Sequence, residues 1–280
     1  MTSEYRTESR ARWAASAAGW EARADALRQA TMPVSAWMVE SISPQAGQTV
    51  LELAAGPGDT GFLAAELIQP GGTLICSDLV PEMLSAAQRR AETLGITNVR
   101  FRQIDAEVID IEAASLDAVL CRWGYMLMTD AESALRETRR VLRRGGRVAL
   151  AAWADPDANP WTVLPPRELI SRGIMEPPDR SAPGQFFWAP DGEIAEALAS
   201  AGFVEYEVEL LDFVVPYPSV RAWWDTTRDL SAGLRQATES IDPALEADVV
   251  DALAVAAKDW TAADGSLSLP ARTWVAVAAA

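Results

Sequence analysis

Three carboxylates lie at or near the ends of three successive predicted strands, and together they could bind a nucleotide-like cofactor. Glu52 lies inside the first strand, two residues before a Gly-rich turn, whereas Asp78 closes the second strand and Asp105 the third. Glycines such as Gly56 and Gly58 let the backbone pass close to a ligand, and the N–H groups at the start of the following helix face it. The order of strand, tight turn and helix therefore predicts a cofactor site.

The acids, rather than the glycines, indicate which cofactor binds. Residues Gly56–Gly61 also satisfy the G-x-G-x-x-G dinucleotide pattern, but that match alone is weak. Asp78 can accept from both ribose hydroxyls, which NAD and S-adenosylmethionine share, and Asp105 can accept from an adenine amino group. Glu52 has no obvious use in a dinucleotide site, whereas a cofactor with a cationic amino-acid tail would need such an acid.

Apolar runs alternate with helical patterns between residues 45 and 155. We expect strands at Thr49–Ala54, Thr73–Asp78, Val99–Asp105, Leu116–Trp123 and Arg147–Trp153, separated by helices at Thr60–Ile68, Pro81–Leu94 and Ala131–Leu142. Pro81 suits the first turn of a helix, and Gly95 suits a helix end. This alternation predicts an α/β fold with a doubly wound, mostly parallel sheet.

The flanking regions have a different texture. Residues 1–44 are expected to be helical, with a break at Met32–Pro33, and residues 155–190 are rich in Pro and Trp. Further helices are expected at Val163–Ser171, Asp191–Ala201, Val220–Leu230 and Pro243–Trp260, and strands at Phe203–Val215 and Leu267–Val277. We predict one domain over 1–280: a helical segment over the cofactor at 1–44, a cofactor-binding core at 45–155, a substrate lid or cap at 156–190 and 218–264, and a strand pair at 203–217 and 266–278.

Composition excludes several function classes. A net charge of −16 makes nucleic acid an improbable substrate, and the absence of histidine removes the usual general base and the commonest metal ligand. Two cysteines, Cys76 and Cys121, are too few for a zinc site of the Cys/His type, and we expect buried thiols. No membrane span or export signal is visible, so we expect a cytoplasmic protein, with a homodimer as a hypothesis for its assembly.

Four segments in order resemble the successive motifs of class I S-adenosylmethionine-dependent methyltransferases, in particular those similar to the ubiquinone/menaquinone-biosynthesis enzymes. The segments are Glu52–Gly58, Ser77–Asp78, Gln103–Ala106 and Val141–Arg147, and the resemblance covers roughly residues 45–155. It implies a Rossmann-like sheet of seven strands and S-adenosylmethionine as cofactor. One departure is Ala54, where the family has its first glycine; alanine is tolerated there if its φ is negative.

The resemblance also implies roles for individual residues. Glu52 would orient the methionyl amino group, Asp78 would bind the ribose, and Asp105 with Ala106 would contact the adenine edge. The remaining cofactor contacts would be the backbone at Ala54, Gly56 and Gly58, the side chains of Leu79 and Met83 beside the adenine, and the backbone around Arg122 and Trp123 at the methionyl end.

Each role has a structural alternative. Asp78 could cap the helix that starts near Pro81, Asp105 could be a turn residue, and Glu52 could be one partner of an internal ion pair. Met83 has the spacing of a core residue as much as that of a cofactor wall.

Methyl transfer from a sulfonium is an in-line displacement that depends mainly on alignment and exclusion of water. If the acceptor must lose a proton, Tyr125 is our candidate base, with a packed aromatic as its alternative. A rival mechanism places Mg²⁺ at Asp155, Asp157 and Asn159, although these are also ordinary turn residues. We predict no metal site.

Most of the eleven tryptophans lie outside the predicted core strands, where a lid would form. Such aromatics suit an apolar or aromatic small molecule, and we predict that Trp20, Trp161 and Trp188 contact it, although each could instead anchor a helix. The chain is thus predicted to be a small-molecule methyltransferase. The alternatives are an NAD(P)-dependent oxidoreductase, for which no Tyr-x-x-x-Lys is present, and a non-catalytic S-adenosylmethionine-binding protein.

Overall fold

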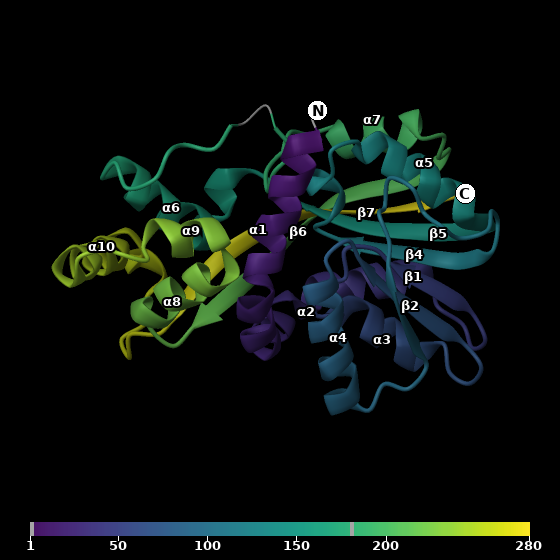
Figure 1. Cartoon of the computed structure of the whole chain (residues 1–280), viewed down its shortest axis with the longest axis horizontal. Coiled ribbons are helices and arrows are strands. Elements are labelled where there is room, and N and C mark those ends of the chain that lie inside the picture. Colours follow the sequence, from purple (N-terminus) through teal and green to yellow (C-terminus); the bar gives the residue numbers. More distant parts are fainter. Residues whose placement is uncertain (1–2, 180–181) are drawn as a thin grey trace.

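The computed structural model describes residues 3–179 and 182–280, and its centre is a seven-stranded sheet (Figure 1). The strands are β1 (Thr49–Glu52), β2 (Thr73–Asp78), β3 (Val99–Gln103), β4 (Leu116–Arg122), β5 (Leu142–Trp153), β6 (Glu205–Tyr217) and β7 (Leu267–Ala279). Their order is 3-2-1-4-5-7-6, and only β7 runs antiparallel to its neighbours. The predicted doubly wound, mostly parallel fold of seven strands is confirmed.

Helices cover both faces of this sheet. The core helices are α2 (Ala24–Ile42), α3 (Asp59–Leu67), α4 (Pro81–Leu94), α5 (Ala131–Val141) and α7 (Glu193–Ser200). Figure 1 shows α3 and α4 on one side of the sheet and α5 and α7 on the other. The central strands are apolar because both faces are covered: Val50, Leu51 and Leu120 are fully buried.

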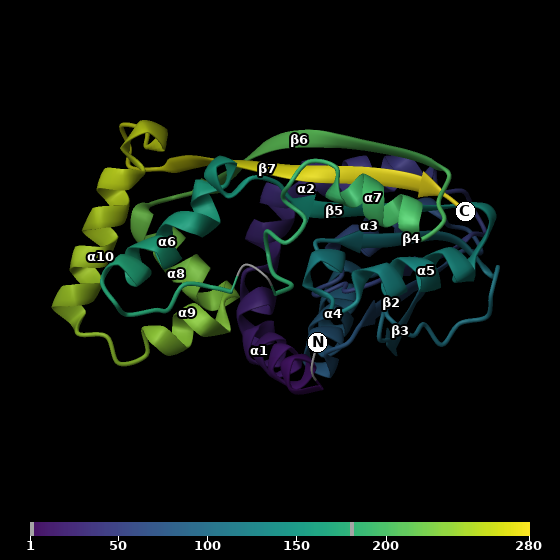
Figure 2. The same cartoon turned by 90° about the horizontal axis from the view of Figure 1, so that it is seen from above.

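A second group of helices lies beyond the far ends of β6 and β7, away from the core helices (Figures 1 and 2). This group contains α6 (Pro160–Ser171), α8 (Val220–Leu230), α9 (Ala232–Ala237) and α10 (Pro243–Ala256), and we refer to it as the cap. Helix α1 (Ser3–Ala22) contacts α4 of the core on one side and α8 and α9 of the cap on the other. The N-terminal helix therefore joins the core to the cap.

The predicted helix break at Met32–Pro33 is wrong. Pro33 lies inside α2, and the helices instead separate at Arg23. The face of α2 that carries Val34, Met38 and Ile42 is buried against the sheet. Burial of these side chains compensates for the one backbone hydrogen bond that a proline removes.

Several predicted element ends are also corrected. β1 ends at Glu52 rather than Ala54, because Ala54 has a φ of 50° that no strand residue adopts. β5 begins at Leu142, five residues before the predicted start, and α9 was not predicted. α10 ends at Ala256, where a short 3₁₀ turn (Lys258–Trp260) follows. The shortness of α9 leaves too few residues for a helical period to stand out in the sequence.

Candidate active site

The predicted cofactor residues lie along one edge of the sheet. β3, β2, β1 and β4 are adjacent and parallel, so their carboxyl ends meet at this edge. Asp78 ends β2, Glu52 ends β1, Arg122 ends β4, and Asp105 follows β3 by two residues. Ligands of open α/β sheets bind outside the carboxyl ends of the strands, where the strand order reverses, and β1 and β4 flank that point here.

Asp78 connects the glycine turn to β2. Its Oδ2 atom accepts a hydrogen bond from the Gly56 N–H at 3.0 Å, and its Oδ1 atom accepts from the Val80 N–H at 2.9 Å. Burial raises the pKa of the Asp78 carboxyl, and the backbone donors oppose that rise. Because each oxygen accepts only one of these bonds, the carboxylate keeps acceptor capacity for ribose hydroxyls. The capping alternative is also met in part, since the Val80 N–H lies at the start of α4.

Glu52 is a buried acid, 2% exposed, at the end of β1. Desolvation raises the pKa of Glu52 to about 8, against the charge of Arg122 and a hydrogen bond from the Gly61 N–H. A Cβ atom at Gly61 would collide with Oε2 of Glu52, so a glycine is needed there. This Oε2 atom is itself buried without a hydrogen-bond partner. An unsatisfied buried carboxylate oxygen suits a ligand that brings a cationic donor, as a methionyl ammonium group does.

The predicted adenine contacts separate into two groups. Leu79 is 39% exposed beside the carboxyl edge of the sheet. The Oδ1 atom of Asp105 accepts a hydrogen bond from the Glu107 N–H, and its Oδ2 atom lies 3.7 Å from the Arg6 guanidinium of α1. Ala106 is buried directly after Asp105. Met83, in contrast, is buried in a cluster with Ala17, Val80 and the tryptophans of α1. The core alternative therefore describes Met83 better than the predicted cofactor wall does.

Comparisons with known proteins agree with this geometry. The ubiE/COQ5 methyltransferase family matches residues 34–163. The chain is 28% identical to nocamycin O-methyltransferase of Saccharothrix syringae, over 75% of this chain and 78% of that protein. It is 33% identical to the ubiquinone/menaquinone biosynthesis C-methyltransferase UbiE of Pasteurella multocida, but over only 42% of this chain and 44% of that protein. The chain is an S-adenosylmethionine-dependent methyltransferase, and just under half of its length is similar to the ubiE/COQ5 methyltransferase family.

The fold of this methyltransferase is also that of solved structures. The YcgJ protein of Bacillus subtilis superposes with a TM-score of 0.56 at 21% identity, covering 88% of this chain and 97% of that one. The methyl donor of the chain is S-adenosylmethionine, which replaces the NAD(P) alternative. The orphaned Glu52 oxygen, the Asp78 carboxylate and the exposed Leu79 fit that cofactor in type.

Ala54 departs from the expected backbone conformation of this methyltransferase. The condition given for alanine at this position, a negative φ, is not met: Ala54 has a φ of 50°, and Trp123, directly after the neighbouring strand β4, has a φ of 58°. Non-glycine residues in this region carry strain of about 1–3 kcal/mol, and such strain gathers at functional sites. Gly124 makes room for the Ala54 methyl group, since a Cβ atom at Gly124 would lie 2.8 Å from it.

The side chain of Arg122 has a use that the sequence did not reveal. We predicted only a backbone contact at the methionyl end, but the guanidinium reaches across to α2 and donates to Thr31 and Ser35. Beside the glycine turn, the buried Asp59 forms an ion pair at 2.8 Å with the partly buried Arg90. Thr31 and Ser35 are polar residues one helical turn apart on an otherwise apolar face, and this pattern was the signal available in the sequence.

Tyr125 is poorly suited to act as a base in this methyltransferase. Its hydroxyl is buried and lies 2.6 Å from the Thr138 Oγ1 atom, and burial raises the pKa of Tyr125 well above its usual value. The ring packs beside Trp188, with centroids 6.0 Å apart. These contacts favour the alternative of a packed aromatic with a satisfied hydroxyl.

We expect Tyr125→Phe to keep methyl transfer within about threefold of the wild-type rate while lowering stability by about 1 kcal/mol, because one buried hydrogen bond is lost. Initial rates and urea denaturation would measure the two effects. A loss of kcat by more than a hundredfold with an intact fold would restore Tyr125 as a catalytic group.

The three predicted substrate tryptophans have different surroundings. The Trp20 indole donates to the Leu230 carbonyl at 3.0 Å and so joins α1 to α8, while Trp188 is buried against Tyr125. Trp161, at the start of α6, packs beside Trp153, with centroids 5.1 Å apart, and its indole N–H is buried without a partner. Helix anchoring accounts for Trp20 and Trp188, and Trp161 retains a free donor.

The segment considered for Mg²⁺ is a turn. Asp155 accepts from the Asp157 N–H at 2.8 Å, and Asn159 is buried and bonded to the backbone of Arg272. Among residues 3–179 and 182–280, no group of three His, Cys, Asp or Glu side chains could hold a metal ion. Cys76 and Cys121 are buried free thiols, as predicted. Within the same residues, no helix has the length and apolar character that a membrane crossing requires.

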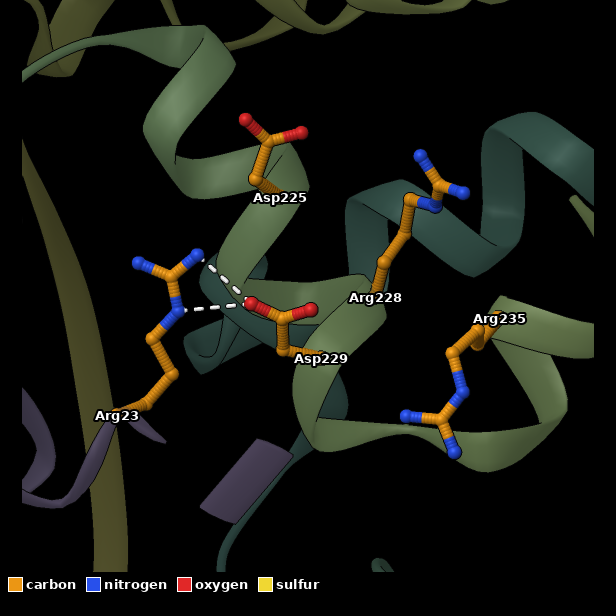
Figure 3. A pocket seen from close by; sticks show the side chains of 5 residues that line it. All are labelled: Arg23, Asp225, Arg228, Asp229 and Arg235. Atoms are coloured by element: carbon orange, nitrogen blue, oxygen red, sulfur yellow. Dashed lines mark hydrogen bonds and ion pairs between the residues drawn. The ribbon is translucent and has the colours of Figure 1, made fainter. Parts of the chain in front are cut away.

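A charged pocket that the sequence did not predict lies where α1 and α2 meet the cap. Its volume is about 300 Å³, and it is lined by Arg23, Asp225, Arg228, Asp229 and Arg235 (Figure 3). Figure 3 shows Arg23 turned toward Asp229, and their closest atoms are 2.7 Å apart. Arg228 lies 3.0 Å from Glu246, and Arg235 donates to the Ala15 carbonyl. Arg23 and Arg235 therefore hold the N-terminal helices against the cap, whereas Arg228 joins two helices of the cap.

Proposed function

We propose that this methyltransferase moves a methyl group from S-adenosylmethionine to an apolar or aromatic small molecule by in-line displacement. The observation that carries the proposal is an aromatic cluster next to the cofactor edge. Trp123 and Trp153 stack with centroids 4.1 Å apart, and Phe213 and Trp161 pack beside them. Trp123 directly follows β4, and Trp153 is the last residue of the adjacent strand β5. The cluster therefore lies beside the methionyl end of the predicted cofactor site.

The cofactor would supply an already activated methyl group, so the residues have binding and alignment tasks. Glu52 would hold the methionyl ammonium group, Asp78 the ribose, and Asp105 with Leu79 the adenine. The backbone at Ala54, Gly56 and Gly58 would approach the cofactor closely. Helix α1, which contacts α4 and carries Arg6 beside Asp105, would cover this site, and the cap would close over the acceptor.

Two features support an aromatic or otherwise flat acceptor. The cluster offers ring faces and no charged group other than Arg122, which lies over Trp123 with its guanidinium carbon 4.9 Å from the ring centroid. The buried indole N–H of Trp161 can donate to an acceptor oxygen, which would satisfy an otherwise unpaired polar group. The relatives named above are an O-methyltransferase and a C-methyltransferase, so their names favour neither atom. A cytoplasmic location and a homodimer stay predictions.

The test pairs a cofactor measurement with an acceptor measurement. Saturating S-adenosylhomocysteine should raise the melting temperature of the wild-type chain, because it binds only the folded state. Methyl transfer from labelled S-adenosylmethionine should then be found with hydroquinones or phenols and be absent with aliphatic polyols of similar size.

We expect Trp161→Leu to raise the acceptor KM at least about tenfold without changing the Kd for S-adenosylhomocysteine, because ring contacts and one donor are lost. The matched control is Trp37→Phe, since the Trp37 indole is bonded to Glu209 on β6. Equal acceptor KM values for wild type and Trp161→Leu would contradict the assignment.

A further inference from the structure

A chain of buried hydroxyl groups connects the N-terminal helix α2 to the cofactor edge through Arg122. Thr31 and Ser35 are buried on the face of α2 that packs on the core. The Arg122 Nη1 atom donates to Thr31 Oγ1 and, at 3.3 Å, to Ser35 Oγ. Ser35 Oγ lies 2.9 Å from Thr60 Oγ1 at the start of α3. Three elements thus fix the position of one guanidinium.

Arg122 differs from most buried arginines in what it contacts. A buried guanidinium is usually paired with a carboxylate. Among the residues that the structure describes, no carboxylate lies within the 4.0 Å of an ion pair to Arg122, and its hydrogen-bond partners are the two neutral hydroxyls. Its positive charge is therefore not neutralised by a direct partner, and it acts on the acids around it.

Asp59 and Glu52 are the acids that interact with the charge of Arg122, and of the two only Glu52 has no ion-pair partner of its own among the described residues. Arg122 on β4 favours ionisation of Glu52, whereas burial opposes it, as do the charges of Asp59 on α3 and Asp78 on β2. Asp59 is itself paired with Arg90 of α4, and the Cys76 thiol of β2 is held in its neutral form by burial. From α2, Asp25 also pairs with Arg90, at 3.0 Å, whereas the Thr31 and Ser35 hydroxyls, which carry no charge, contact Arg122.

We propose that Thr31 and Ser35 are positioning residues for cofactor binding, because they hold the Arg122 guanidinium where it favours the carboxylate form of Glu52. This inference rests on the proposed role of Glu52 as the partner of the methionyl ammonium group. Without the two hydroxyls the guanidinium can turn away from the acid, and Glu52 then keeps its proton to a higher pH. Helix α2 thereby acts on Glu52 through the Arg122 side chain.

The test measures the pH dependence of binding for the double variant Thr31→Val/Ser35→Ala. Calorimetry with S-adenosylhomocysteine from pH 6 to 9 should show a wild-type affinity that rises toward pH 8. In the variant the rise should move up by about one pH unit, which makes binding about tenfold weaker at pH 7 but only about twofold weaker at pH 9. Ser35→Ala alone deletes one hydroxyl and should shift the profile in the same direction by less.

Two controls separate positioning from a general loss of structure. Thr227→Val removes a buried helical threonine of α8 that bonds only the Trp223 carbonyl, and it should leave the profile unchanged. 5′-Methylthioadenosine lacks the amino-acid tail, so its affinity should be the same for wild type and variant at every pH. An equal loss of S-adenosylhomocysteine affinity at all pH values, or an unshifted profile, would overturn the inference. Failure of wild type to bind S-adenosylhomocysteine at any pH would instead overturn the proposed function.

Discussion

Asp78→Ala is expected to weaken binding of S-adenosylhomocysteine by at least about a hundredfold, which corresponds to a loss of about 3 kcal/mol. The carboxylate has two tasks that alanine cannot perform. It holds the glycine turn through the Gly56 N–H and the start of α4 through the Val80 N–H. It would also accept from the ribose hydroxyls, and charge-assisted bonds of this kind contribute about 1.5–3 kcal/mol each.

Calorimetry on the folded variant would measure this loss, with circular dichroism to confirm the fold. Asp78→Asn keeps the shape and one acceptor oxygen, so it should fall between wild type and Asp78→Ala. The matched control is Asp110→Asn, because the Asp110 side chain is fully exposed and its ion pair is a 3.4 Å contact with Arg102 on the surface. A variant Asp78→Ala that binds within threefold of wild type would show that Asp78 only caps the helix.

The position of Asp78 could be predicted because local rules determine it. A six-residue strand with an apolar centre at 74–76 ends at this acid, and Pro81 then begins a helix, so the acid must lie at the carboxyl edge of a strand. The same reasoning placed Glu52 and the turn around Gly56. Parallel pairing of the strands then brings these residues together, since all parallel strands end at the same edge.

Other features depend on contacts that are remote in sequence. Pro33 lies within a helix because strands distant in sequence bury the apolar face of α2. Local helix propensity does not include the free energy of that burial. Met83 is covered by α1, which lies more than sixty residues earlier in the chain. The Arg122 side chain reaches hydroxyls 87 and 91 residues away. Ala54 keeps a positive φ because Gly124 leaves space for its methyl group, and neither residue reveals this pairing alone.

Glu52→Gln is expected to change how stability depends on pH. Burial raises the pKa of Glu52 from 4.5 to about 8, so between these values the folded chain holds a proton that the unfolded chain has lost. Stability from this group is therefore complete below pH 4.5 and is lost as the pH rises through 8. A shift of about three and a half pKa units corresponds to about 5 kcal/mol, and we expect a loss on the order of 2–4 kcal/mol between pH 5.5 and 8.5.

Glutamine cannot ionise, so Glu52→Gln should lack this loss and become more stable than wild type at pH 8.5 while resembling it at pH 5.5. Urea denaturation at both pH values would measure the difference, and other titrating groups cancel in the comparison. Glu66→Gln, at an exposed position of α3, is the matched control and should follow wild type. The same Glu52→Gln protein should bind S-adenosylhomocysteine at least about tenfold more weakly at pH 8.5, because it has no carboxylate for the ammonium group. If the difference in free energy of unfolding between Glu52→Gln and wild type stays constant with pH, Glu52 is already ionised in the free protein. The charge of Arg122 would then outweigh the effect of burial on Glu52.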